Sequence, residues 1–129
     1  DDARAARQQL CTALGDALSR RDFLALLAGL NHDSAPMRLY WLSTLLLDAL
    51  KWQQGAARWL ANADQQPLVE QLAAGLSLSQ LQNFLHSLFR TREQLLRVAG
   101  VNRELLLTDL LLSWEQMLTS DAPRPTYHL

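Results

Sequence analysis

Two segments separated by three residues decide the fold: Arg92-Glu93-Gln94-Leu95-Leu96 and Gly100-Val101-Asn102-Arg103-Glu104-Leu105-Leu106-Leu107-Thr108-Asp109-Leu110-Leu111-Leu112. Leucines recur at spacings of three and four on both sides of the break, which is typical of amphipathic helices. Gly100 can end a helix, and Asn102 is a favoured residue at a helix N-terminus. The stretch therefore predicts two helices joined by a short turn.

The same periodicity extends through the rest of the chain. Ser77-Leu78-Ser79-Gln80 has the form of a capping box for the fifth helix, and Pro36 stands where a first helical turn tolerates proline. The predicted helices cover about residues 3–19, 21–30, 34–54, 67–74, 78–98 and 103–119.

Composition agrees with a helical protein. The chain has 31 leucines, 17 alanines and three valines but no isoleucine, so the residues that favour sheets are scarce. Its 129 residues are enough for one domain. We predict an all-α fold: a single compact bundle of about five to six helices over residues 1–129, with a central apolar helix at about 34–54. Trp59 and Leu60, in the linker after that helix, should fold back onto the core, and the tail over 120–129, with two prolines, should be extended.

Charge and motifs exclude several functional classes. The net charge is -1, without the basic excess of a DNA-binding domain, and no apolar run is long enough for a membrane span. Cys11 is the only cysteine, which excludes an internal disulfide and fits a reducing compartment. No pattern of a catalytic, cofactor or metal site occurs, so we predict no enzyme activity and no cofactor for this domain. The chain begins without methionine, which leads us to expect a piece of a longer protein.

Arg92 does not fit the pattern of the fifth helix, because it points into the middle of that helix's apolar side. A buried guanidinium needs an acid nearby, and Asp48 and Asp109 are the candidates because both interrupt apolar runs. A contact with a partner and a side chain that reaches out to solvent are the alternatives.

Two leucines of the sixth helix, Leu105 and Leu112, also do not fit. They lie seven residues apart on its polar side, with Asp109 between them. Either a neighbouring segment of the chain covers them, or they form a contact with another protein of a complex.

The order of these segments resembles the C-terminal third of the delta prime subunits of the bacterial DNA polymerase III clamp loader. The likeness is strongest over 92–112, weaker at Arg20-Arg21-Asp22 and Leu30-Asn31-His32, and visible again in the tail ending His128-Leu129. The resemblance implies a collar domain, a helical oligomerisation domain that performs no chemistry and follows N-terminal ATPase-like domains absent from this chain.

The resemblance also implies partners and interface residues. The partners would be the collar domains of the delta and gamma or tau subunits, in a cytoplasmic pentameric ring that loads the sliding clamp and meets DNA only indirectly. It implies no small-molecule substrate and no membrane. The candidate interface residues are those of the best-matching segment and two tryptophans: Arg103, Glu104, Leu105, Asp109, Leu112, Trp41 and Trp52.

A helical nucleic-acid-binding or regulatory module is the alternative function. Arg90, Arg97 and Arg103 would then contact phosphates. The near-neutral charge argues against it.

Overall fold

The computed structural model describes residues 2–98 and 100–120, and helices and turns account for this part of the chain. The prediction of an all-α bundle is confirmed. The elements are α1 (Asp2–Arg20), η1 (Phe23–Leu26), α2 (Leu27–Leu30), α3 (Ala35–Gln53), η2 (Ala57–Trp59), η3 (Ala63–Gln65), α4 (Gln66–Gly75), α5 (Leu78–Arg97) and α6 (Arg103–Ser120). Ser120, expected in the tail, ends α6; the rest of the expected tail, 121–129, lies outside the described residues.

Local capping signals set the starts of the last two helices. The Ser77 side chain accepts from the Gln80 backbone N–H, and the Gln80 side chain accepts from the Ser77 N–H, so the predicted capping box is present. The Asn102 side chain accepts from the Leu105 N–H at 3.0 Å and caps α6. Between α5 and α6, Gly100 has φ 74°, a conformation that glycine adopts without strain.

The predicted helix at 21–30 begins later than expected. Arg21 has φ 56°, and the Asp22 N–H bonds back to the Ala17 carbonyl at 2.9 Å, which closes the end of α1. This left-handed residue cannot belong to a following right-handed helix. The chain therefore re-enters helix only at Phe23, as a short 3-10 turn leading into α2.

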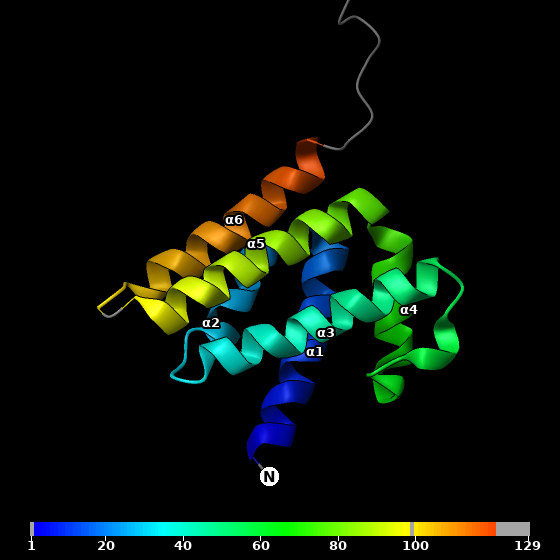
Figure 1. Cartoon of the computed structure of the whole chain (residues 1–129), viewed down its shortest axis with the longest axis horizontal. Helices are drawn as coiled ribbons and strands as arrows, with labels where there is room; N and C mark the ends of the chain where they lie inside the picture. The colour runs from blue at the N-terminus through cyan, green and yellow to red at the C-terminus, as the bar shows by residue number, and fades with distance from the viewer. Residues whose placement is uncertain (1, 99, 121–129) are drawn as a thin grey trace, which may run out of the picture.

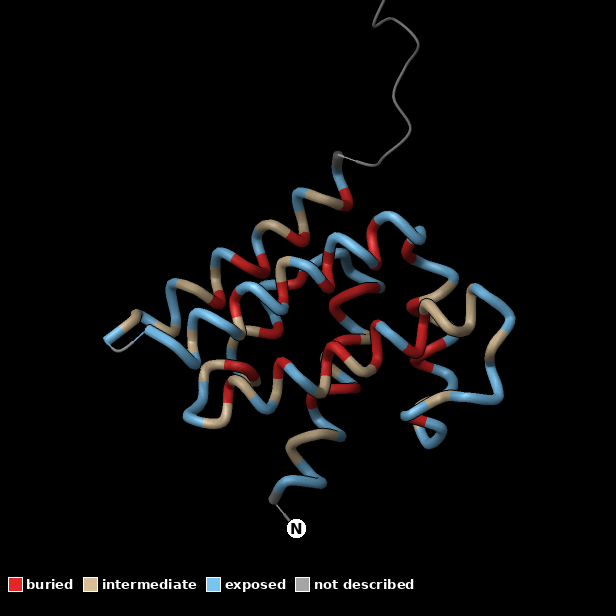
Figure 2. The backbone as a smooth tube through the Cα atoms, in the orientation of Figure 1, coloured by how far each residue is buried: buried red, intermediate tan, exposed pale blue. Residues whose placement is uncertain are grey.

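The long helices α3, α5 and α6 lie next to one another, with α5 in the middle, and α1 crosses behind them (Figure 1). Buried segments of all these helices face the space between them (Figure 2). An aromatic trio joins three of the elements: Phe84 and Trp114 stack at 4.7 Å, and Phe23 meets both edge-on at 5.6 Å. The Trp114 indole N–H donates to the Ser87 hydroxyl at 2.8 Å, so its polar atom is satisfied inside the core.

The third helix was expected to be the central, apolar helix of the bundle. It contacts several other helices, as expected, but they do not surround its whole circumference. Helix α3 packs against α1, α2, α4 and α5. Its third apolar side nevertheless remains exposed, because no described helix covers Tyr40 and Leu47, which are 53% and 40% exposed. An apolar surface thus runs along the outside of the bundle.

The linker expectation is half right. Leu60 packs against the core as predicted. Trp59 does not fold back: its exposed fraction is 68%, and the backbone carbonyl, rather than the ring, is held, by the Lys51 ammonium at 3.0 Å.

Candidate subunit interface

The outer side of α6 carries the two leucines that the sequence pattern left unexplained. Leu105 is 57% exposed and Leu112 39% exposed, and the exposed Asp109 lies between them. Their neighbours Leu107, Leu110, Leu111, Trp114 and Leu118 are buried against the rest of the bundle. We call Leu105, Asp109, Leu112 and Gln116 the α6 seam. Next to it lies a shallow depression lined by Leu112, Glu115, Gln116 and Thr119.

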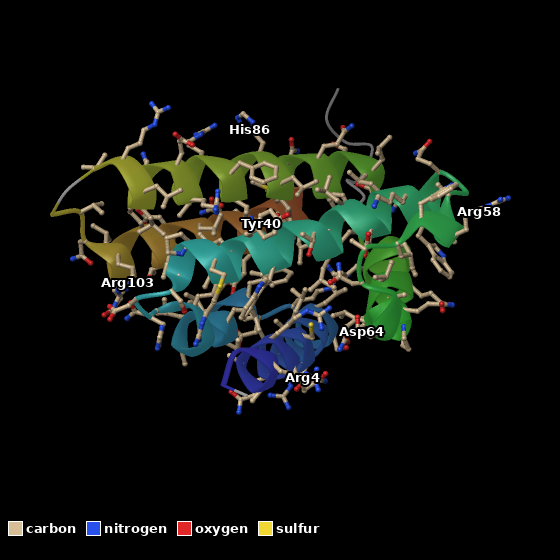
Figure 3. All side chains as sticks on the ribbon, turned by 60° about the horizontal axis from the view of Figure 1, so that its bottom comes forward. Arg4, Tyr40, Arg58, Asp64, His86 and Arg103 are labelled. Atoms are coloured by element: carbon tan, nitrogen blue, oxygen red, sulfur yellow. The ribbon has the colours of Figure 1, made fainter. Side chains whose placement is uncertain are left out.

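Glu104 and Arg103, at the start of α6, differ in their contacts. Glu104 is exposed in the first turn. Arg103 is held within the chain: its Nε donates to the Asn31 side chain at 2.8 Å, and its Nη1 lies 3.1 Å from the Asp33 carboxylate. Figure 3 shows Arg103 at the end of the molecule where the turn before α3 meets α6. Arg103 therefore ties this turn to α6, while its side chain remains 37% exposed.

Trp41 and Trp52, the other two candidates, are partly buried and pack against the core. They belong to α3, roughly 100–120° around that helix from Tyr40, and are not part of the α6 seam. Within the described residues, the candidates thus fall into two groups: the exposed side chains of α6, and side chains engaged inside the domain.

Arg92 meets neither of the acids predicted for it. Its Nε donates to the Pro36 backbone carbonyl at 2.9 Å, and its guanidinium carbon lies 5.7 Å from the centre of the Tyr40 ring. A backbone carbonyl and an aromatic face replace the expected carboxylate. Asp109 is exposed on α6, and Asp48 is fully buried elsewhere, so the predicted ion pair is not formed.

Asp48 instead holds the linker between α3 and α4. Its carboxylate accepts from the backbone N–H groups of Ala61 (2.9 Å) and Asn62 (2.7 Å) and from the Asn62 side chain (2.8 Å). The Lys51 ammonium lies 3.4 Å away. The buried charge is therefore satisfied mainly by donors from a single loop. In the sequence, Asp48 stood out as an acid that interrupts an apolar helix, but the pattern did not indicate which groups would hydrogen-bond to it.

The same loop is joined to α1 through Arg7. Its guanidinium donates to the Asn62 side chain at 2.7 Å and to the Asp64 carboxylate at 2.8 Å. The hydrogen bond from Arg7 lowers the pKa of Asp64, and the same bond raises the pKa of Arg7. Burial raises the pKa of the Cys11 thiol, one turn further along α1. The sequence pattern did not indicate this cluster, because Arg7 lies more than 50 residues from both Asn62 and Asp64.

Neither metal-binding nor membrane-spanning features were found in the part of the chain that the structure covers. Residues 2–98 and 100–120 contain no group of three or more histidine, cysteine, aspartate or glutamate side chains placed to hold a metal ion. In the same ranges no helix has the length and apolar character needed to cross a bilayer.

Comparison with known proteins identifies the family. Residues 1–116 match the family model described as "DNA polymerase III, delta subunit, C terminal". The DNA polymerase III subunit delta' of Yersinia pestis is 56% identical over 114 residues, 88% of this chain and 34% of that protein. The corresponding protein of Escherichia coli (strain K12) is 50% identical over 124 residues, 96% of this chain and 37% of that protein.

A more distant relative is the subunit delta' of Buchnera aphidicola subsp. Schizaphis graminum, which is 28% identical over 117 residues, 91% of this chain and 36% of that protein. The chain thus spans about a third of the length of the curated relatives it matches. The family model bears the delta name and these relatives bear the name delta', which agrees with the resemblance found along the chain. The chain belongs to the family of C-terminal domains of DNA polymerase III delta subunits, among its delta prime members.

Proposed function

We propose that this domain is a subunit-assembly, or collar, domain of a bacterial clamp loader and that it binds a neighbouring collar through the α6 seam. One observation carries the proposal: Leu105 and Leu112 are both exposed on the same side of α6, whereas the other leucines of this helix are mostly buried. Two leucines on the outer surface contribute nothing to the stability of a bundle whose core is already well packed. They contribute binding free energy when a partner protein covers them.

The energetics fit a contact between proteins. Complete burial of a leucine side chain contributes about 1.5–3 kcal/mol, so covering two half-exposed leucines supplies roughly 2 kcal/mol. Asp109 between them favours a partner that brings a basic or hydrogen-bonding group to that point. Further contacts are needed for a stable complex, and the neighbouring depression at Gln116 and Thr119 offers a place for them.

In this proposal the domain acts as a scaffold. Contacts with the collars of delta and of gamma or tau fix its place in a pentameric ring, so that ATP-driven movements in other domains act on the sliding clamp. The domain itself performs no chemistry, and DNA is met only through the assembled complex. The proposed place of action is the bacterial cytoplasm, in accordance with the bacterial relatives.

Reconstitution tests the proposal. The protein at its full natural length is mixed with delta and gamma or tau subunits, and complex formation is followed by size-exclusion chromatography with light scattering. We expect Leu105→Asp with Leu112→Asp to prevent incorporation while the helical circular dichroism spectrum stays native. Leu78→Asp is the matched control, because Leu78 is a 44% exposed leucine in the first turn of α5. Normal incorporation of the folded double variant would refute the assignment of the seam.

The alternative, a nucleic-acid-binding module, has an equally direct test. Arg97 is paired with Glu93 on α5, and Arg103 is engaged by Asn31 and Asp33, so two of its three proposed phosphate contacts already have partners. This alternative would be favoured if the domain bound duplex DNA and its affinity fell steeply as the salt concentration rose.

A further inference from the structure

A second apolar surface lies on the other side of α5 from the α6 seam. Tyr40 and Leu47 of α3 are 53% and 40% exposed, and Phe89 and Leu96 of α5 are 44% and 56% exposed. Helices α3 and α5 pack side by side, whereas α6 adjoins the opposite flank of α5 (Figure 1). We call Tyr40, Leu47, Phe89, Leu96 and Arg92 the α3/α5 face.

Matching rows of side chains build this face. On α3, Pro36, Tyr40 and Leu47 follow one another at spacings of four and seven; on α5, Phe89, Arg92 and Leu96 do so at three and four. Side chains with these spacings lie on one side of a helix. Arg92 joins the rows, because it binds the Pro36 carbonyl and covers the Tyr40 ring. In Figure 3, Tyr40 lies between α3 and α5, while His86 points away from the bundle on the outer side of α5.

Arg92 gives the face a defined chemical preference. Its Nε donates a hydrogen bond to the Pro36 carbonyl. Within the described residues its two terminal nitrogens form no hydrogen bond and no ion pair. The carbonyl and the aromatic ring hold the guanidinium in place, so little side-chain entropy remains to be lost when it binds. A guanidinium fixed among exposed apolar side chains is suited to a carboxylate that arrives with apolar neighbours, because a fork of two N–H groups matches two carboxylate oxygens.

We propose that the α3/α5 face is a second docking site, occupied by a helix of another protein of the complex that carries a carboxylate within an apolar stripe. The inference rests on the proposed assembly function and adds to it a surface separate from the α6 seam. Tyrosine and arginine are among the residue types over-represented at energetically dominant interface positions, and here the Arg92 guanidinium lies over the Tyr40 ring. The apolar part of the face is of the order of a few hundred Å², the size at which exposed patches on soluble proteins mark interaction sites.

Binding measurements with purified delta and gamma or tau subunits test the inference, using the protein at its full natural length. We expect Phe89→Asp to weaken binding of one partner about tenfold or more, because it places a charge in the centre of an apolar contact. Arg92→Gln should weaken the same partner, and Arg92→Lys should restore only part of the loss, because lysine lacks the planar fork. Gln94→Asp, at an exposed position roughly 140° around α5 from Phe89, is the control and should bind normally.

The outcomes separate this inference from the proposed function. If the α6 seam variants lose one partner and Phe89→Asp loses the other, both are supported. If Phe89→Asp, natively folded, binds every partner normally while the α6 seam variants do not, the α3/α5 face is refuted and the proposed function stands. Loss of the same single partner in both variant sets would refute a separate second site.

If Phe89→Asp only abolishes self-association, the occupant is a second copy of this chain and the assignment of the α3/α5 face to another protein is wrong. If the unaltered protein binds none of the other proteins, both proposals fall. Should the Arg92 variants not fold, Phe89→Asp alone decides, since its side chain is already half exposed.

Discussion

Glu115 of α6 accepts a 2.9 Å hydrogen bond through its side chain from the backbone N–H of Phe23, which lies 92 residues earlier in the chain. The same carboxylate oxygen accepts from the Leu24 N–H at 3.2 Å. The first N–H groups of a helical turn lack partners within the turn, and the capping residue of η1, Asp22, makes no side-chain bond to them. A side chain from α6 therefore caps η1 from outside and fixes it against the bundle.

Replacing Glu115 tests this cap. We expect Glu115→Ala to lower the free energy of unfolding by about 1–2 kcal/mol, because two backbone donors lose a charged acceptor. Glu115→Gln keeps one acceptor oxygen and should cost less. Glu104→Ala, an exposed acid in the first turn of the same helix, is the control for the loss of charge. Urea denaturation followed by circular dichroism measures all three. Equal stability of Glu115→Ala and Glu104→Ala would show that the cap contributes nothing.

Asp48 should be the more sensitive acid. Its carboxylate is fully buried and satisfies two backbone N–H groups and the Asn62 amide. We expect Asp48→Ala to cost about 3 kcal/mol, because hydrogen bonds to charged groups contribute more than neutral ones and the freed donors stay buried. Asp48→Asn retains one acceptor oxygen and should be milder.

Hydrogen exchange gives the local readout for Asp48. The Ala61 and Asn62 amides should exchange much faster in Asp48→Ala, since their acceptor is gone. Unchanged protection of these two amides in a folded variant would mean that the loop is held by other contacts.

The Arg7–Asp64 pair predicts a pH dependence of known sign. The hydrogen bond from Arg7 lowers the folded-state pKa of Asp64 below its ordinary value of 3.8. A carboxyl group with a lowered pKa stabilises the fold above its unfolded-state pKa, and that contribution disappears as the pH falls through the folded-state pKa. The Asp64 side chain is 62% exposed, so the contribution is below about 1 kcal/mol.

Comparison with Asp64→Asn isolates this effect from the titration of the other acids. At about pH 7 the unaltered protein should be slightly more stable than the variant, and the gap should close on acidification below about pH 4. Thermal unfolding at a series of pH values measures the gap. A gap that stayed constant or grew on acidification would contradict the assigned pairing.

The fold was largely predictable because its signals are local. Leucine spacing, the Ser77 capping box, Asn102 and Gly100 act within a few residues, so they can be read along the chain and the structure places helices where they indicate. The late start of the second helix was missed because a left-handed arginine, rather than a glycine, closes α1. The cap at Glu115, the loop held by Asp48 and the carbonyl bound to Arg92 were not predictable, because each joins residues distant in sequence through a partner that carries no pattern of its own.

The candidate interface shows the same division. The position of Leu105 and Leu112 off the core side of α6 follows from helical angle and was predicted, whereas their exposure, which decides against a covering segment among the described residues, was not. The intramolecular engagement of Arg103 and the packing of Trp41 and Trp52 depend on which helices meet. Periodicity identifies a residue that lies off the core side of its helix. It does not show what that residue contacts.

Cys11 provides a built-in reporter of unfolding. The thiol is buried, and burial raises its pKa, so the reactive thiolate is scarce in the folded protein. We expect a thiol reagent such as dithionitrobenzoate to react roughly a hundredfold or more slowly with the folded protein than with the protein in urea, because reaction requires opening of the bundle. Equal rates in both states would contradict the burial of Cys11.

The buried Cys11, the only cysteine of the chain, makes possible the measurement that tests the central claim most directly. Leu112→Cys places an accessible thiol in the α6 seam, and the alkylation rate at that residue, followed by peptide mass spectrometry, is compared between the free protein and the complex with delta and gamma or tau subunits. Leu78→Cys is the control, because Leu78 is similarly exposed and lies on α5, away from the α6 seam. If the α6 seam is a subunit interface, the thiol at position 112 reacts rapidly in the free protein and at least about tenfold more slowly in the complex, while the thiol at 78 reacts equally in both. A thiol at position 112 that reacts as fast in the complex as in the free protein would contradict the account.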